Sequence, residues 1–82
     1  MEQNLTVLIA DSGEDFCAAL SAALQRTDGF QVIGTAFDGE QAIRLVRERK
    51  PDILVLDLML SKQDGISVLK ALNTLDRKPI TL

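Results

Sequence analysis

The sequence of 82 residues predicts an α/β domain in which helices cover both faces of a parallel sheet. Short aliphatic runs with no polar alternation indicate strands that are buried on both faces. Between these runs lie stretches of about 10 to 15 residues with apolar side chains at helical spacing. Because strands and helices alternate along the chain, we expect parallel strands joined by right-handed crossovers.

The first part of the chain predicts a strand, a helix and a second strand. Residues 5–11, "LTVLIAD", are the first aliphatic run, and residues 30–37, "FQVIGTAF", are the second. Residues 12–29 are expected to be helical, with Ser12 as the N-cap and Gly29 at the C-terminal end. The spacing predicts an apolar face on this helix that consists of Phe16, Leu20, Ala23 and Leu24.

The middle of the chain predicts a second helix and a third strand. Residues 38–50 carry Asp38 at the expected N-cap and Gln41 three residues later, which is the spacing of a capping box. Pro51 ends this helix, and residues 52–57, "DILVLD", are the third aliphatic run. The apolar stripe of the helix is predicted to be Ala42, Ile43, Leu45 and Val46.

The last part of the chain predicts a third helix and the start of a fourth strand. Residues 78–82, "KPITL", fit the strand, and residues 66–76 fit the helix, with an apolar face of Val68, Leu69, Leu72 and Leu75. A domain usually has roughly 100 to 150 residues. We therefore expect residues 1–82 to be one domain that is incomplete at its C-terminus. The open edge of the fourth strand should make an isolated chain unstable or self-associating, for example as a homodimer.

Composition excludes several classes of function. A formal net charge of −3 argues against direct binding of nucleic acid, and no apolar run approaches the ~18 residues of a membrane span. The chain has no histidine, which removes Ser/His and Cys/His nucleophile pairs. Its one cysteine, Cys17, has no partner for a disulfide or a zinc site. We expect Cys17 to be a small buried or half-buried residue of a protein in the reducing cytoplasm.

Two of the predicted strands end in a carboxylate, at Asp11 and at Asp57. If the strand order begins 2-1-3, these ends are neighbours, at the sheet edge where open α/β sheets bind ligands. Two carboxylates in one crevice repel unless a proton or a hard cation lies between them, which favours Mg²⁺ or Mn²⁺. A carboxylate is also a nucleophile that accepts a phosphoryl group. The plainer alternatives are a solvated strand end for Asp57 and an interaction of Asp11 with the helix dipole.

These motifs together resemble the receiver domain of two-component response regulators. The resemblance is carried by "VLIAD" before a helix, by "ILVLD" followed by "LMLSKQDG", and by the interval of 46 residues between Asp11 and Asp57. It covers the whole chain and implies a flavodoxin-like, doubly wound parallel sheet of order 2-1-3-4-5, without strand five and the last helices. Through "VIGTAFDGEQAI" and "PDILVLDLML", the chain resembles more narrowly the receiver of a transcription factor that controls sporulation.

The resemblance implies a role for particular residues. Asp57 is the implied phosphoacceptor, Asp11 and Asp57 are implied ligands of Mg²⁺ together with the backbone carbonyl of Met59, and Asp64-Gly65 form the turn into the third helix. The family usually has a second acid directly after the first, where this chain has Ser12. A neutral hydroxyl is a poorer ligand than a carboxylate, so we expect weak binding of Mg²⁺. Ser12 is then either an ordinary helix cap or a weak ligand of the metal.

The resemblance implies a signalling receiver that is not an enzyme. Asp57 would take a phosphoryl group from the phosphohistidine of a histidine kinase or phosphotransferase protein and so control an output domain, expected to bind DNA and regulate transcription. The alternative is a protein-interaction module with weak or no phosphorylation, which Ser12 favours. A phosphohydrolase is poorly supported because Met59 stands where that chemistry needs a second acid. A nucleotide-binding enzyme is poorer still, because no glycine-rich phosphate loop follows the first strand.

Overall fold

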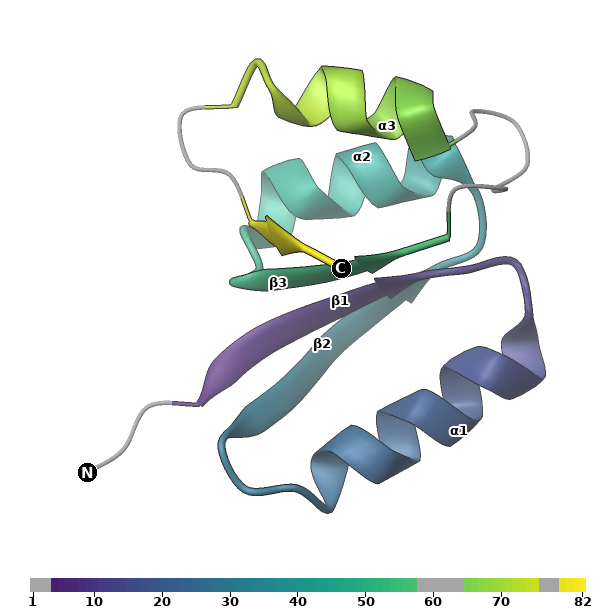
Figure 1. The fold of residues 1–82 in the computed structure, drawn as a ribbon, viewed down its shortest axis with the longest axis vertical. Helices are drawn as coiled ribbons and strands as arrows, with labels where there is room; N and C mark the ends of the chain where they lie inside the picture. Colours follow the sequence, from purple (N-terminus) through teal and green to yellow (C-terminus); the bar gives the residue numbers. More distant parts are fainter. Residues whose placement is uncertain (1–3, 58–64, 76–78) are drawn as a thin grey trace.

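The computed structural model describes residues 4–57, 65–75 and 79–82 of the chain. Within them, strands and helices alternate as predicted (Figure 1). The elements are β1 (Leu5–Ala10), α1 (Glu14–Gln25), β2 (Phe30–Ala36), α2 (Gly39–Arg49), β3 (Ile53–Leu56), α3 (Gly65–Leu72) and β4 (Ile80–Thr81).

The strands form one parallel sheet in the order β2-β1-β3-β4. β1 lies between its two neighbours, with Val7 paired to Val32 of β2 and to Ile53 of β3. β4 pairs with β3 on the far side, where Ile80 is opposite Ile53. The predicted order is therefore confirmed as far as these strands extend it.

Helices cover both faces of the sheet, as expected for strands that are apolar on both sides. α2 and α3 pack together on one face, and α1 lies on the other, against β1 and β2 (Figure 1). The larger core, under α2 and α3, consists of Leu8, Ala10, Ala36, Ala42, Leu45, Val46, Leu54, Leu56, Val68 and Leu72. The smaller core, under α1, consists of Val7, Ile9 and Cys17, with partly buried side chains around them.

The apolar face of α1 differs from the prediction by one position. Cys17 is buried against the sheet, with Leu20 and Leu24 packed beside it, whereas Phe16 is 51% exposed and Ala23 is also exposed. Both possible faces contain Leu20 and Leu24, so helical spacing does not choose between them. A residue is turned by about 100° from its neighbour on a helix, and burying Cys17 therefore turns Phe16 toward solvent.

Both predicted ends of α1 are corrected by the structure. Its N-cap is Gly13, which has no side chain, and Ser12 is exposed one residue earlier, so the prediction of Ser12 as the cap is wrong. The reason is that the Asp11 carboxylate binds the N–H of Gly13, which starts the helix one residue later. At the other end, Gly29 has φ +97° but lies directly before β2, and its carbonyl accepts the N–H of Leu5 at 2.8 Å.

The N-cap, the apolar stripe and the C-terminal stop predicted for α2 are confirmed, but the Gln41 side chain bonds to the residue before the N-cap and not to the N-cap itself, as a standard capping box would require. The Asp38 side chain accepts the N–H of Gln41 at 2.9 Å, and the Gln41 side chain accepts the N–H of Phe37 at 2.8 Å. The predicted stripe is buried or partly buried against the sheet. Lys50 ends the helix in the left-handed conformation, and the buried Pro51 follows it.

The predictions for α3 are confirmed in part. Val68 and Leu72 are buried and Leu75 packs against them, but Leu69 is exposed. The helix ends at Leu72, before the predicted end at residue 76, so only Val68 and Leu72 of the predicted face lie on regular helix facing the sheet. None of the helices in the described part of the chain is long and apolar enough to cross a membrane.

Candidate functional site

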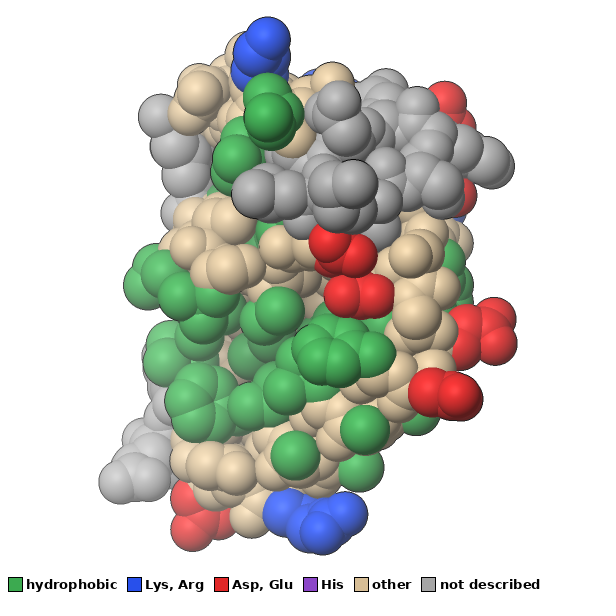
Figure 2. All heavy atoms as spheres, turned by 45° about the vertical axis from the view of Figure 1, so that its right-hand side comes forward, with side chains coloured by type: hydrophobic (Ala, Val, Ile, Leu, Met, Phe, Trp, Pro, Cys, Tyr) green, Lys and Arg blue, Asp and Glu red, His purple; other side chains and the backbone are tan. Residues whose placement is uncertain are grey.

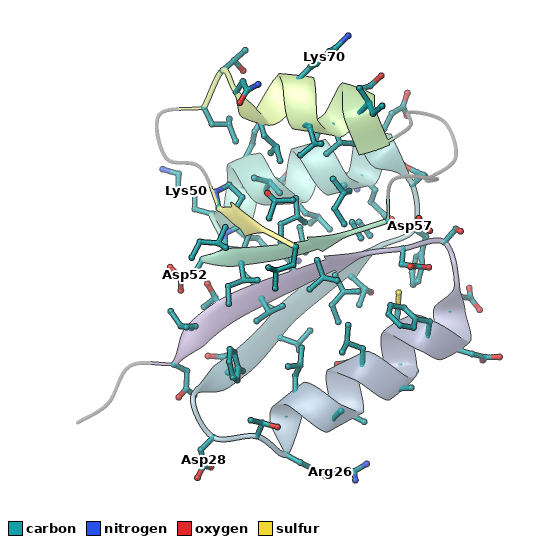
Figure 3. The ribbon with its side chains drawn as sticks, in the orientation of Figure 1. Arg26, Asp28, Lys50, Asp52, Asp57 and Lys70 are labelled. Carbon is teal, nitrogen blue, oxygen red and sulfur yellow. The ribbon has the colours of Figure 1, made fainter. Side chains whose placement is uncertain are left out.

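Asp11 and Asp57 follow neighbouring strands at the same edge of the sheet. Ala10 pairs with Leu56, so the next residue of each strand is one of the two aspartates. The N–H of Asp57 donates to the carbonyl of Ala10 at 2.9 Å, and the N–H of Asp11 donates to the carbonyl of Ala36 at 2.9 Å. Neighbouring strands lie about 4.8 Å apart. The two backbones therefore meet as expected, at the carboxyl ends of the strands (Figure 3).

The structure holds the Asp11 carboxylate in one orientation, against the start of α1. Its Oδ1 accepts the N–H of Gly13 at 2.8 Å, and the residue is partly buried. A Cβ atom on Gly13 would lie 3.2 Å from this oxygen, closer than a relaxed contact. The positive end of the α1 dipole also favours a negative charge here.

Gly13 is the residue of this site that the sequence analysis missed. Its N–H orients the carboxylate of Asp11, whose strand ends beside that of Asp57. The signal was present, because an aspartate often bonds to the backbone two residues further on and so closes a turn. Ser12, which lies between Asp11 and Gly13, was predicted to be the cap or a weak ligand, but it makes no cap bond.

The other three positions predicted for the site, Ser12, Met59 and Asp64, do not add a described ligand to it. Ser12 has an exposed side chain directly after Asp11, where it neither caps α1 nor adds a carboxylate. Met59 and Asp64 lie outside the described residues. The described part of the site therefore consists of Asp11, Asp57 and the turn at residues 11–13.

The donors at this edge fit a hard divalent cation. Mg²⁺ is usually held by one or two carboxylates and keeps several waters. Asp11 and Asp57 supply two carboxylates from adjacent strand ends. Within residues 4–57, 65–75 and 79–82, no three or more His, Cys, Asp or Glu side chains gather as a metal site. Two carboxylates are compatible with a Mg²⁺ ion that keeps most of its water. Figure 2 shows acidic side chains near the middle of the molecular face that it presents.

Cys17 lies beneath the site and has the chemistry of a core residue. Its thiol is buried and donates to the carbonyl of Asp11 at 3.4 Å. Burial raises the pKa of the Cys17 thiol, and the nearby charge of Asp11 raises it further. The thiolate is the reactive form, so this environment disfavours a nucleophilic cysteine. The prediction of a small buried residue is confirmed.

Comparison with known proteins decides the family. A model of the response regulator receiver domain matches residues 7–82. The chain belongs to the response regulator receiver domain family. This assignment agrees with the sheet order and with the two strand-end carboxylates.

One curated relative of this receiver domain is the alkaline phosphatase synthesis transcriptional regulatory protein PhoP of Bacillus subtilis. It is 45% identical over 69 residues, which are 84% of this chain and 28% of the relative. The chain thus spans less than a third of that protein. The narrower expectation of a sporulation regulator is not supported by this relative and is withdrawn.

Solved receiver structures have the same fold. The signal receiver domain of the putative response regulator NarL from Mycobacterium tuberculosis has a TM-score of 0.91 at 25% identity, over 98% of this chain and 64% of that one. CheY in the CheX-CheY-BeF3-Mg complex from Borrelia burgdorferi has a TM-score of 0.80 at 30% identity, over 94% of this chain and 58% of that one. The flavodoxin-like fold class is confirmed.

Proposed function

We propose that this receiver domain accepts a phosphoryl group on Asp57 from the phosphohistidine of a histidine kinase or phosphotransferase protein. The observation that supports this most is the position of Asp57, which is hydrogen-bonded through its backbone to the strand that ends in Asp11. A carboxylate oxygen of Asp57 attacks phosphorus, the bond from phosphorus to the imidazole nitrogen breaks, and the imidazole keeps the electron pair. The product is an aspartyl-phosphate on Asp57.

The two carboxylates have different roles in this proposal. Asp11 Oδ1 is bound to the N–H of Gly13, which orients that carboxylate and suits it to holding a cation. Asp57 ends the strand next to it, and we assign it as the acceptor because the resemblance to receiver domains gives that role to this position. Asp11 and Asp57 would hold Mg²⁺, with the Met59 carbonyl and Ser12 as further proposed ligands. When bound, Mg²⁺ neutralises negative charge where the phosphoryl group arrives between carboxylates. The CheX-CheY neighbour is a complex with BeF3 and Mg, which supports this assignment.

We extend the proposal to control of transcription. The curated relative PhoP is a transcriptional regulatory protein, and this chain matches 28% of its length. The proposed output is a DNA-binding domain elsewhere in such a protein. Phosphorylation replaces the single negative charge of the Asp57 carboxylate with a phosphoryl group that carries about −1.5 to −2 charges, so the strand edge gains roughly one negative charge or less. This change would shift the domain between two conformations.

The test is labelling of the chain with acetyl phosphate, with and without Mg²⁺, measured as intact mass. We expect the mass to increase by one phosphoryl group in Mg²⁺, with no increase for Asp57→Asn. Asp28→Asn is the matched control, because Asp28 is exposed in the turn after α1, at the opposite end of the molecule (Figure 3). Equal labelling of Asp57→Asn and the unchanged chain would contradict the assignment of Asp57.

The second candidate is a receiver that acts through protein association with weak or no phosphorylation. Ser12 favours it, because an exposed hydroxyl stands where the family usually has a second acid. A folded chain that takes no label from acetyl phosphate at any Mg²⁺ concentration would support this candidate and reject the first.

A further inference from the structure

Thr6 and Asp52 bind each other at the end of the sheet opposite to the candidate site. The N–H and the hydroxyl of Thr6 donate to Oδ2 of Asp52, at 2.8 Å and 3.0 Å. The N–H of Asp52 donates in turn to the hydroxyl oxygen of Thr6 at 2.9 Å and to its carbonyl at 3.0 Å. A hydroxyl can donate one hydrogen bond while it accepts another, so these bonds form together. We call this pair the Thr6–Asp52 clamp.

The hydrogen bonds of the Thr6–Asp52 clamp are of a strong kind. A carboxylate that accepts a backbone N–H makes a charge-assisted bond, which is roughly twice as strong as a bond between neutral groups. Both residues are partly buried, and a lower local dielectric strengthens such bonds further. The clamp therefore links β1 to β3 at one defined pair of positions.

The clamp and the candidate site lie at the two ends of one short strand. Asp52 directly precedes the four residues of β3 and Asp57 directly follows them. Figure 3 shows these two aspartates at opposite ends of the strand. Thr6 and Asp52 are 46 positions apart in the sequence, as are Asp11 and Asp57. The intervals are equal because both pairs belong to the single register of β3 on β1.

The side chains of β3 do not specify this register by themselves. All four residues of the strand, "ILVL", are aliphatic. A shift by one residue turns every side chain of a strand to the other face of the sheet. In β3 each position would still receive an aliphatic side chain after such a shift, whereas Asp57 would move out of line with Asp11. A polar contact at a defined position supplies the specification that the aliphatic residues lack.

The charge of Asp52 is too far from Asp57 to act directly on a metal ion there. Five steps along a strand span about 16 Å. The Debye length at physiological ionic strength is only about 8 Å, so charges at the two ends of β3 are largely screened from each other. An effect of the clamp on the site must therefore pass through the position of β3.

We propose that Thr6 and Asp52 are positioning residues, which hold β3 in the register that places Asp57 beside Asp11. This inference rests on the proposed function, in which those two carboxylates bind Mg²⁺. A molecule in which β3 leaves this register offers the cation one of the two carboxylates instead of both. The apparent affinity falls with the fraction of molecules that have a competent site, so a fraction of about one third gives binding about threefold weaker.

The first test is hydrogen exchange at the amide of Asp57, measured without metal. This N–H donates to the carbonyl of Ala10, whereas the N–H of Asp11 donates to the carbonyl of Ala36 on the other side of β1. In Asp52→Ala, exchange should become faster at Asp57 than at Asp11, because only β3 is released. Unchanged exchange at Asp57 would overturn the proposal. Equal acceleration at both amides would also overturn it, because that result indicates a general loss of stability.

The second test is titration of Mg²⁺ by calorimetry, under conditions in which circular dichroism shows every variant to be folded. Thr6→Val and Asp52→Ala should each bind Mg²⁺ about threefold more weakly or worse. Thr6→Ser keeps the hydroxyl and should bind as the unchanged chain does. Thr27→Val and Asp28→Ala are the matched controls, because the Thr27 hydroxyl donates to the Ala23 carbonyl at the exposed end of α1 and Asp28 is exposed in the turn that follows. Both controls should leave the affinity unchanged.

The two tests separate failure of this inference from failure of the proposed function. If Thr6→Val and Asp52→Ala bind Mg²⁺ as tightly as the unchanged chain, the positioning role is wrong and the proposed function stands. If the unchanged chain binds no Mg²⁺, the metal part of the proposed function is wrong. Exchange at Asp57 then still decides whether the Thr6–Asp52 clamp holds β3 in register.

Discussion

The N–H of Asp57 donates to the carbonyl of Ala10 at 2.9 Å, which continues the pairing of β3 with β1 one residue past Leu56. It places Asp57 beside Asp11, although 46 positions of sequence separate the two carboxylates. Parallel pairing is the cause, because neighbouring parallel strands bring their carboxyl ends to one edge.

Ser12→Asp should tighten the binding of Mg²⁺ and speed labelling of Asp57 at low Mg²⁺. An added carboxylate next to Asp11 supplies a charged oxygen ligand where the chain has a hydroxyl. Ser12→Ala is the control, and because Ser12 makes no cap bond, its free energy of unfolding should stay within about 0.5 kcal/mol of the unchanged chain. Titration calorimetry and urea unfolding measure the two effects. Unchanged metal affinity in Ser12→Asp would exclude position 12 from the metal site.

Gly13→Ala should weaken Mg²⁺ binding severalfold with little effect on stability. The new Cβ would lie 3.2 Å from Asp11 Oδ1 and should displace that carboxylate, while φ −85° at Gly13 is open to any residue. Gly29→Ala is the control with the opposite pattern. Nothing lies within 4 Å of its Cβ, but φ +97° strains an alanine, so stability should fall by about 1 kcal/mol or more and metal affinity should not change. Equal effects of both variants on metal binding would contradict the role of Gly13.

Asp38→Ala should lower the free energy of unfolding by about 1 kcal/mol, the usual effect of losing an N-cap. The Asp38 carboxylate accepts the N–H of Gln41, and the Gln41 side chain accepts the N–H of Phe37. Urea unfolding of both single variants and the double variant with Gln41→Ala measures the coupling between the two bonds. Fully additive losses would show that the two bonds at the start of α2 act independently.

Stability should fall above pH 9 because of Cys17. Burial raises the pKa of this thiol from its ordinary value of 9.0, so the unfolded chain loses the proton at a lower pH than the folded chain. Below that pH both states keep the proton, and above it the unfolded state is favoured until the folded thiol also ionises. The urea midpoint of the unchanged chain should therefore decline more steeply from pH 8 to 10 than that of Cys17→Ala. Parallel curves for the two proteins would contradict the raised pKa.

The sequence predicted the elements of this fold well because most of its signals are local. The cap at Asp38 and the stop at Pro51 agree with the structure. The strand order also agrees, but it was implied by the resemblance to receiver domains and not by a local signal. The predicted cap at Ser12 failed, because a competing side chain, Asp11, binds the same turn. The prediction that Phe16 is buried was wrong for another reason. Two possible faces of α1 share Leu20 and Leu24, and only packing against the sheet determines which face is buried.

The sequence by itself determined the alternation of strands and helices, and hence that two strand ends would carry Asp11 and Asp57. Periodicity and turn residues act over a few positions, so they can be recognised in a single chain. Only the tertiary structure decided which oxygen of Asp11 is held by Gly13 and which face of α1 is buried. These features depend on how segments distant in sequence pack against one another, and local pattern does not specify that packing.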